Sequence, residues 1–417
     1  GAWACISLWG DSAPYANKSK DSVFLLTWRL LTGQRRDRFW AFAIAKRQLC
    51  ECGCSGRCTM DAAFSVLAWS FRALLSGSHP RLDHTGKPFR LGTWRRKQAR
   101  KKLRIRGACL AKTADWAWLK QVVGLCGWKQ GRRRYCCWIC KARFVSGSYG
   151  DATVDADWRS TIHDMISFWA ELSADGMFCS KCWEIPSMRI AWLRPDFMHM
   201  VDLGCTQYLN GNLCWYLFVK MGGRRHATLQ ETNKVCNNIA NMINVAARES
   251  QLEPMNIKLT LLRLRAAQAK PKLKLKAADS RCYLPLLVNV LRIFFPPATL
   301  QERLQLSCAQ ALVDIYREMD TWNTTTSPPR ISGLARRHVI LYKELHIMSE
   351  DSELYHMCPK RHMLVHLCES TQETRICPKL EWCYGDESAI GIAAAMARRC
   401  HPSFLGHALL RHDQACH

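Results

Sequence analysis

Three short apolar runs at the start of the chain, separated by polar connections, constrain the fold more than any other feature. They cover residues 4–9 (ACISLW), 22–28 (SVFLLTW) and 39–45 (FWAFAIA). Runs of this length with polar loops between them are typical of neighbouring antiparallel strands. Residues 61–75 then carry apolar side chains at helical spacing, and another short run covers 103–110. The sequence therefore predicts a three-strand meander, a helix and a fourth strand.

The rest of the chain is mainly helical in character. Candidate helices cover 203–219, 229–247, 280–295 and 300–322, and a late helical stretch covers 388–399. We predict an α/β protein whose mixed sheet is interrupted by a large, mainly α-helical insertion before the last helix. This order matches the RNase H-like fold. The predicted segments are 1–125 (first part of an RNase H-like core), 126–186 (Cys-rich and zinc-binding), 187–355 (helical insertion) and 356–417 (completion of the core).

Charge and composition narrow the class of protein. The 417 residues are 48% hydrophobic and 23% charged, as expected for a folded chain. They hold 60 Lys and Arg against 34 Asp and Glu, a net charge of +26, which favours nucleic acid as partner. A basic ribosomal or membrane-surface protein is the alternative. Because the chain begins at Gly1 without a Met, we expect a piece of a longer reading frame.

The cysteines and the longest apolar run bear on the cell compartment. No signal peptide precedes the 23 Cys, so we expect a reduced, intracellular protein in which some cysteines hold zinc. The run at 283–295 is interrupted by Asn289 and Arg292 and is shorter than the roughly 20 residues that a membrane span needs. We therefore predict no membrane association.

Three carboxylates stand at the positions that the RNase H-like order requires. Asp11 follows the first apolar run, Asp115 follows the fourth, and Glu387 opens the late helix. Three converging carboxylates can hold two divalent metals about 4 Å apart, and Mg²⁺ (or Mn²⁺) suits such oxygen ligands. Each residue also has a structural interpretation: a turn for Asp11, a helix N-cap for Asp115 and a first-turn acid for Glu387. Two further residues compete with them, Asp386 for the third place and Asp83 for the first.

Residues 192–204 read W-L-R-P-D-F-M-H-M-V-D-L-G, in which Asp196 and His199 form a D-x-x-H pattern. This segment resembles the signature that follows the second catalytic Asp in DDE transposases of the CACTA (En/Spm) type. The residues around Asp11, Asp115 and Glu387 are also similar to segments of that family, although Ala114 replaces its commoner Gly. The resemblance is spread over nearly the whole chain in short motifs.

The resemblance implies an RNase H-like enzyme that cuts and joins DNA. It assigns the catalytic carboxylates to Asp11, Asp115 and Glu387, with Asp196 and His199 as an accessory pair. It also implies a homo-oligomer and, with the basic runs, a nuclear location. Two alternatives remain: an inactive, transposase-derived protein that binds DNA and zinc, and an RNase H-fold nuclease unconnected with transposition.

Two C-x-x-C pairs predict a four-thiolate zinc site formed by Cys137, Cys140, Cys179 and Cys182, although the 38-residue gap between the pairs is long. A second cluster is a weaker candidate because its spacing is tight for one tetrahedral ion; it consists of Cys50, Cys52, Cys54 and Cys58. Buried free thiols are the alternative for both. His362 and His366 lie one helical turn apart, and we interpret them as helix packing because no H-E-x-x-H glutamate accompanies them.

Basic runs predict contacts with DNA phosphates. The first lies within 90–106, the second beside Tyr135, and the third within 270–276. Any single run has a solvated helix face or loop as its alternative. The predicted DNA-binding residues are Arg95, Arg96, Lys97, Arg100, Lys101, Lys102, Arg132, Arg133, Arg134, Lys272 and Lys274.

Overall fold

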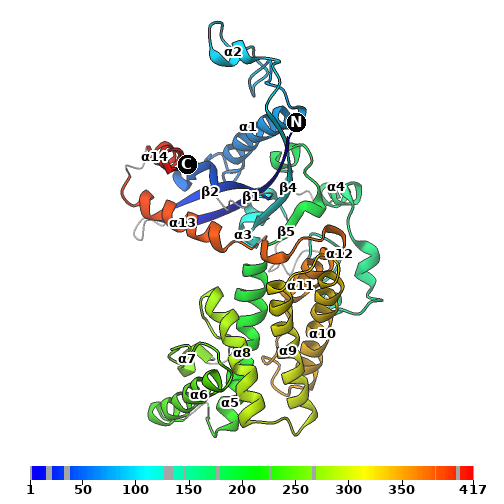
Figure 1. Ribbon diagram of the computed structural model, residues 1–417, viewed down its shortest axis with the longest axis vertical. Coiled ribbons are helices and arrows are strands. Elements are labelled where there is room, and N and C mark those ends of the chain that lie inside the picture. Colours follow the sequence, from blue (N-terminus) through cyan, green and yellow to red (C-terminus); the bar gives the residue numbers. More distant parts are fainter. Residues whose placement is uncertain are drawn as a thin grey trace. The chain divides into compact units, whose positions relative to one another are not determined.

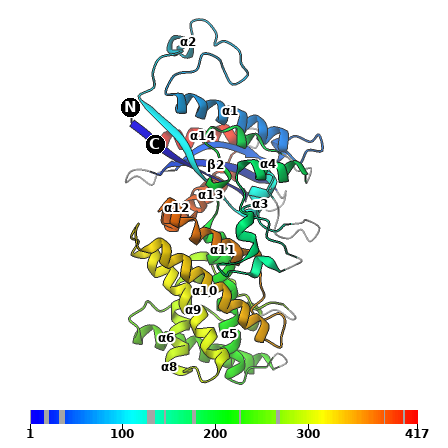
Figure 2. The ribbon, with the colours of Figure 1, turned by 90° about the vertical axis from the view of Figure 1, so that its right-hand side faces the viewer.

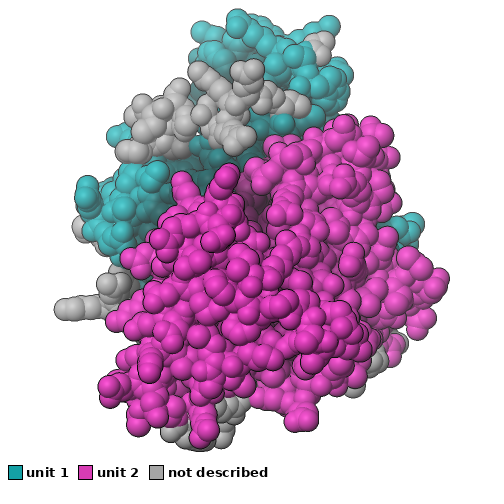
Figure 3. All heavy atoms as spheres, turned by 60° about the horizontal axis from the view of Figure 1, so that its bottom comes forward, with its two compact units in different colours: residues 1–127, 162–196, 383–417 teal, residues 128–161, 197–382 magenta. Residues whose placement is uncertain are grey.

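The computed structural model describes residues 2–15, 21–31, 38–125, 135–144, 147–174, 179–224, 227–264, 269–380, 382–400 and 404–416 (Figure 1). The chain divides into two compact units, coloured separately in Figure 3. Unit 1 comprises Gly1–Gly127, Ile162–Asp196 and Cys383–His417, and unit 2 comprises Trp128–Thr161 and Phe197–Trp382. The first boundary falls close to the predicted one at 125, whereas the segment predicted as 126–186 is shared between the two units.

A five-stranded mixed sheet in the order β3-β2-β1-β4-β5 forms the centre of unit 1. The first three strands form an antiparallel meander, and β4 and β5 both run parallel to β1. The α/β class, the meander and the fourth strand are therefore confirmed. The fifth strand was not predicted, because three residues carry no readable alternation. The strands are β1 (Ala2–Pro14), β2 (Ser22–Leu30), β3 (Phe39–Ala45), β4 (Ile105–Ala114) and β5 (Leu193–Pro195).

Both faces of this sheet are covered by helices. Gly10 faces α3 (Trp116–Trp118), because a Cβ added to it would overlap the Trp118 indole. That ring meets Phe64 of α1 (Arg57–Ser76) edge-on. Side chains alternate along a strand, so Trp9 and its partner Thr27 face the other way. There Thr27 donates a hydrogen bond to Asp386 of α13 (Tyr384–Ala397). Helices α1 and α13 therefore lie on opposite faces, and Asp11 shares the α13 face with Trp9.

Helix α1 packs against β4 and the turn η5 within unit 1. Its length and composition are those of a membrane span, and among the described residues it is the one helix that meets both criteria. A long exposed connection that carries α2 leads from α1 to β4 (Figure 2). The helical elements of unit 1 are η1 (Lys46–Gln48), α1 (Arg57–Ser76), α2 (Trp94–Gln98), α3 (Trp116–Trp118), η2 (Leu119–Val123), α4 (Met165–Ala174), η5 (Lys181–Glu184), η6 (Ile190–Trp192), α13 (Tyr384–Ala397) and α14 (Leu405–Cys416).

The regular secondary structure among the described residues of unit 2 is helical, as the sequence predicts for most of its length. Capping boxes fix two helix starts: Thr228 pairs with Glu231 at α6, and Thr299 pairs with Glu302 at α9. Antiparallel α9 and α10 pack together, and α10 also packs on α11. The elements are η3 (Ser148–Gly150), η4 (Asp157–Thr161), η7 (Met198–Thr206), α5 (Gln207–Lys220), α6 (Leu229–Glu249), α7 (Leu261–Leu264), α8 (Ala277–Phe294), α9 (Leu300–Asp320), α10 (Ser327–Met348), α11 (Pro359–Glu369), α12 (Thr371–Thr374) and η8 (Pro378–Leu380).

Candidate active site and metal centre

Three aspartates follow the carboxyl ends of three adjacent parallel strand segments. Gly10 of β1 pairs with Ala114 of β4, and Ala114 pairs in turn with Pro195 of β5. The next residue in each chain segment is an aspartate: Asp11, Asp115 and Asp196. Since in-register parallel strands end at one edge of a sheet, these residues gather along that edge.

Asp11 and Asp115 are half-buried and each accepts a backbone hydrogen bond. Asp11 is not a turn residue, because β1 continues to Pro14 and pairs Asp11 with Leu25. Its Oδ1 accepts the N–H of Ser12 at 2.6 Å. Asp115 is the N-cap of α3, and its Oδ1 accepts the N–H of Trp118 at 2.6 Å. A helix N-cap and a metal ligand are compatible roles, because a carboxylate has a second oxygen.

Asp386 and Glu387 occupy different environments in the first turn of α13. Asp386 is buried, pairs with the Arg38 guanidinium at 2.8 Å and accepts the Thr27 hydroxyl at 3.2 Å. Burial raises the pKa of its carboxyl, and the positive charge of Arg38 opposes that rise. Glu387 is half-buried, and its Oε1 lies 4.0 Å from the Cys383 thiol. Of the two competing acids, Asp386 is thus the one held in a buried ion pair, and Glu387 is the more exposed.

Cys383, at the start of α13, is hydrogen-bonded to Asp196, the residue that follows β5. The backbone N–H of Cys383 donates to Oδ1 of Asp196, and its thiol donates to Oδ2, each at 3.0 Å. Asp196 is completely buried. Burial among carboxylates raises the pKa of the Cys383 thiol well above its ordinary value, so the thiol stays a donor. Sequence reasoning missed Cys383, whose only signal is its place just before the Tyr-Gly-Asp-Glu segment.

The chain boundary between the two units falls between the two residues of the accessory pair. Asp196 closes the middle segment of unit 1, and His199 lies in η7 at the start of a segment of unit 2. The backbone oxygen of His199 accepts a hydrogen bond from Lys360 at 2.8 Å. Asp83, the other competitor for the first carboxylate, accepts the N–H groups of Thr85 and Lys87 in an exposed turn of the connection between α1 and β4.

Metal-compatible side-chain groups among the described residues do not include Asp11, Asp115 or Glu387. A group of this kind requires ligand atoms within 4.8 Å of one another. The three carboxylates therefore share one region of unit 1 without reaching this spacing.

Unit 2 contains a fully buried Cys/His centre made of Cys137, Cys140, His362 and His366. One ligand atom from each lies within 4.8 Å of the others. The Cys140 thiol is 3.1 Å from Nε2 of His362, which is 3.0 Å from Nε2 of His366. Ligands in the pattern C-x₂-C and H-x₃-H are typical of structural metal sites. This set can hold a metal ion.

The surroundings of this centre fit a metal-bound state of the ligands. The Trp158 indole meets both imidazoles edge-on, at centroid distances of 4.6 and 4.8 Å. Burial lowers the pKa of His366 well below its ordinary value, so this imidazole is neutral, as ligation demands. Burial also raises the pKa of the Cys137 thiol, and only a cation in contact would offset that cost of forming a thiolate.

Two sequence predictions are corrected here. Cys137 and Cys140 meet His362 and His366, not Cys179 and Cys182, and the histidines are candidate ligands rather than packing residues alone. Cys182 is buried in unit 1, where it interacts with Lys112, and Cys179 is exposed. The prediction was wrong because sequence spacing alone does not tell which pairs share an ion. A second C-x-x-C pair completes a four-ligand site at least as well as a distant H-x₃-H pair does.

The first basic run forms an exposed arm, residues 77–104, between α1 and β4. Its base is closed by hydrogen bonds from Arg100 N to His79 O and from Leu103 N to Gly77 O, at 2.9 and 2.8 Å. The indole of Trp94 is 64% exposed beside these cations. The predicted DNA-binding residues on the arm are all exposed; they are Arg95, Arg96, Lys97, Arg100, Lys101 and Lys102.

The other basic residues are placed differently. Lys274 is exposed, whereas Lys272 is half-buried with its ammonium 5.0 Å from the centre of the Tyr208 ring. Burial lowers the pKa of Lys272. Lys272 therefore has a packing role in unit 2. The run Arg132, Arg133 and Arg134 lies outside the described residues.

Comparisons with known proteins add no relative. No protein-family model matches the chain, and no curated protein matches it either.

Proposed function

We propose that this chain is a transposase-like enzyme of RNase H-like fold, which cleaves and transfers DNA strands with two divalent metals. The observation that carries the proposal is the row of aspartates at one sheet edge. Asp11, Asp115 and Asp196 each follow a residue of the in-register set Gly10, Ala114 and Pro195. Carboxylates gathered in this way are the ligands that Mg²⁺ or Mn²⁺ requires.

The strand order supports the RNase H-like assignment. An antiparallel meander followed by two strands parallel to the first is the arrangement that this fold requires. In the proposed enzyme Asp11 lies on β1 and Asp115 directly follows β4, while α13 carries Glu387 and covers the face that Asp11 shares. These elements keep the carboxylates in one region of unit 1, from which divalent metals could gather them.

In the proposed chemistry the carboxylates position the metals and the DNA backbone supplies the scissile bond. The bound metals would activate a water or a 3′-hydroxyl and stabilise the departing oxygen. Asp11, Asp115 and Glu387 would hold them. Because the described carboxylates are not yet within ligand spacing, we propose that divalent metal and DNA draw them together. Asp196, held by Cys383, fixes the start of α13 and acts as a positioning residue for Glu387.

The arm of residues 77–104 is the proposed DNA-binding surface of unit 1. Ten of its residues are Lys or Arg, and Asp83 is its single acid. Exposed cations neutralise phosphates without reading sequence, and the exposed Trp94 can stack on an unpaired base. We propose zinc as the ion of the Cys137, Cys140, His362 and His366 centre, where it would stabilise unit 2. A nuclear location and a homo-oligomer belong to the same proposal.

Nicking of labelled supercoiled DNA in Mg²⁺ or Mn²⁺ tests the enzyme proposal, with Asp115→Asn as the decisive variant. Asn caps helices about as well as Asp, so this variant keeps the start of α3 while removing a carboxylate ligand. We expect cleavage by the wild-type chain and loss of at least 100-fold in the variant. Joining of a cut end to a second DNA distinguishes a transposase from a nuclease. Equal cleavage by both proteins would refute the assignment of Asp115.

A second candidate is an inactive transposase-derived protein that binds DNA and zinc. It is favoured by the occupied carboxylates: both oxygens of Asp196 accept from Cys383, and Oδ1 of Asp115 caps α3. This candidate predicts salt-sensitive DNA binding that is unaffected by Asp115→Asn, without cleavage in either protein.

A further inference from the structure

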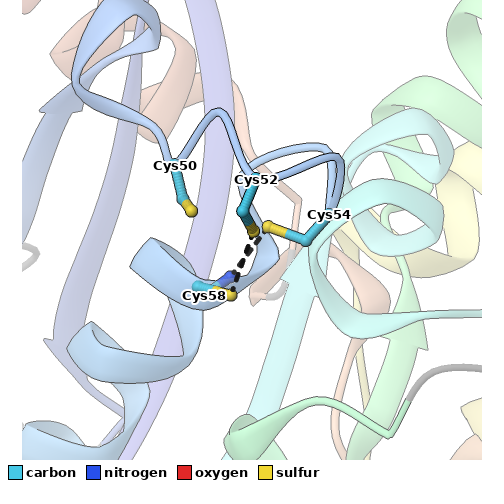
Figure 4. Close-up of side chains that lie close together, drawn as sticks. All are labelled: Cys50, Cys52, Cys54 and Cys58. Carbon is cyan, nitrogen blue, oxygen red and sulfur yellow. Dashed lines mark hydrogen bonds between the residues drawn. The ribbon is translucent and has the colours of Figure 1, made fainter.

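Four cysteines that the proposed function does not use converge at the start of α1. Cys50, Cys52 and Cys54 lie on the loop after η1, and Cys58 lies in the first turn of the helix (Figure 4). Their sulfurs all lie within 4.8 Å of one another, and the Cys52 and Cys58 sulfurs are 3.7 Å apart. Four thiolates 2.3 Å from a tetrahedral zinc would be about 3.8 Å from each other. The cluster is therefore close to the size of a four-thiolate site.

Exposure separates these residues from ordinary free cysteines. Free cysteines are usually buried as small apolar side chains, and most described cysteines of this chain are buried. Cys52 and Cys58 are exposed, and Cys50 and Cys54 are half-exposed. Packing therefore gives no reason for four of them to meet at one point on the surface.

The loop is built to present its thiols to one point. Gly53, Ser55 and Gly56 all have positive φ, a backbone conformation typical of tight turns. The N–H of Cys50 donates to the Thr59 hydroxyl at 2.9 Å, which ties the start of the loop to the helix. The sequence analysis considered the C-x-C-x-C spacing too tight for one tetrahedral ion. Because the loop turns at these residues, all four sulfurs nevertheless lie within 4.8 Å of one another.

Helix α1 also lacks the usual groups that stabilise a helix start. Its N-cap is Gly56, no side chain caps it, and its first turn contains no acid. Instead the N–H of Cys58 points to the Cys54 sulfur at 3.5 Å. An anionic metal–thiolate centre there would satisfy the positive end of the helix dipole.

We propose that Cys50, Cys52, Cys54 and Cys58 bind one zinc ion as a four-thiolate site that fixes the start of α1. Binding replaces the proton of each thiol by a bond to the metal. This site is separate from the Cys/His centre of unit 2 and does not depend on the proposed function.

The test counts metal per chain in protein purified under reducing conditions, by elemental analysis after gel filtration. We expect the double variant Cys54→Ser/Cys58→Ser to hold one zinc fewer than the wild type. Cys282→Ser, which removes an exposed cysteine outside both clusters, should hold the wild-type amount. In a Cys137→Ser/His366→Ala background, cobalt substituted for the remaining zinc should give the absorption of a four-thiolate site. The conservative variant Cys58→His should retain the ion.

Two outcomes would overturn the proposal. One is equal zinc in the Cys54→Ser/Cys58→Ser variant and the wild type. The other is a disulfide in place of the metal. Trypsin cleaves after Arg47, Arg57 and Arg72, so a Cys52–Cys58 disulfide would link peptides 48–57 and 58–72 in unreduced mass spectra. Circular dichroism of the variants checks that loss of metal is not loss of fold.

Discussion

Asp196 and Cys383 are 187 positions apart in the chain, and two hydrogen bonds of 3.0 Å join them in the interior of unit 1. One comes from the backbone and the other from the thiol, so both oxygens of a completely buried carboxylate are satisfied. The pair connects the end of β5 to the start of α13, the helix that carries Glu387.

Removing the thiol donor should therefore weaken the fold. Cys383→Ala removes the hydrogen bond that the thiol donates to Oδ2 of Asp196, and loss of such a bond to a buried carboxylate costs about 1–3 kcal/mol. We expect urea unfolding to report a loss of this size. Cys383→Ser keeps a donor of similar length and should lose much less. Equal stability of the Ala and Ser variants would show that the thiol hydrogen bond contributes nothing.

Asp115 should have separable structural and chemical effects. Asp115→Ala removes the N-cap of α3 and should cost about 1 kcal/mol of unfolding free energy, whereas Asp115→Asn should cost a few tenths at most. Metal-dependent DNA cleavage should be lost in both. Parallel denaturation and nicking assays make this comparison, and a stable but inactive Asn variant is the expected result. A fully stable Ala variant would contradict the capping role.

The arm should dominate the salt dependence of DNA binding. The triple variant Arg95→Ala, Arg96→Ala and Lys97→Ala removes three exposed cations, each worth about one unit in the slope of log K against log salt. We expect weaker binding and a slope reduced by about 2–3, measured by fluorescence anisotropy on a duplex oligonucleotide. A control with the same change in charge replaces Lys234, Arg398 and Arg399, which are exposed elsewhere. Similar slopes for both variants would show that DNA binding depends on the net charge of the chain and not on the position of the cations in the arm.

The buried Cys/His centre should stabilise unit 2 through its metal. His366→Ala should lose one zinc per chain and lower the melting temperature by several degrees, because the binding free energy of a structural ion adds to that of folding. Chelation of the wild-type protein should have a similar effect. Trp158→Phe keeps an aromatic ring against both histidines and should keep the zinc. Full zinc content in His366→Ala would argue against this ligand set.

His338 should make the stability of unit 2 sensitive to acid. It is completely buried between the carbonyl of Cys308 and the guanidinium of Arg361, at 3.0 and 3.3 Å, and near the Tyr342 ring. Burial, with Arg361 adding to its effect, lowers the pKa of His338 from 6.5 to about 3. Between these two pH values His338 is therefore protonated in the unfolded chain and neutral in the folded chain.

The sign of this effect follows from linkage. The contribution of neutral His338 to the free energy of unfolding is complete above pH 6.5 and is lost as the pH falls towards 3. We expect the urea midpoint of the wild type to fall between pH 7 and pH 5 more steeply than that of His338→Gln, which has no proton to gain. Parallel curves for the two proteins would show that His338 does not titrate on unfolding.

The sequence was most informative where the pattern was periodic or local. The meander, the fourth strand and the position of Asp115 as a helix N-cap were readable because apolar runs and capping residues act within a few positions. Strand β5 was not readable, since Leu193–Pro195 pairs with β4 through tertiary context alone. The alternative interpretation of Asp11 as a turn residue was wrong, because β1 continues through a polar segment that pairs with β2.

Partners that are distant in the chain were the hardest to predict. Nothing in the sequence selects His362 over Cys179 as the neighbour of Cys140, because the choice depends on how α11 packs. The thiol of Cys383 has no motif of its own, although it meets Asp196. Spacing rules identify residue types that can ligate a metal, and the fold decides which of them meet.

The division of unit 1 into three chain segments has a consequence for its synthesis on the ribosome. Strands β1 to β4 precede β5 and α13 in the chain. The parallel edge of β4 therefore has no partner until β5 appears, and the face opposite α1 has no α13 until the segments between β5 and α13 have been made. During that interval most of unit 2 is translated. Nascent unit 1 therefore carries an open sheet edge and a bare apolar face, both of which attract other chains. A chaperone that binds nascent β1 to β4 would protect these strands until α13 arrives.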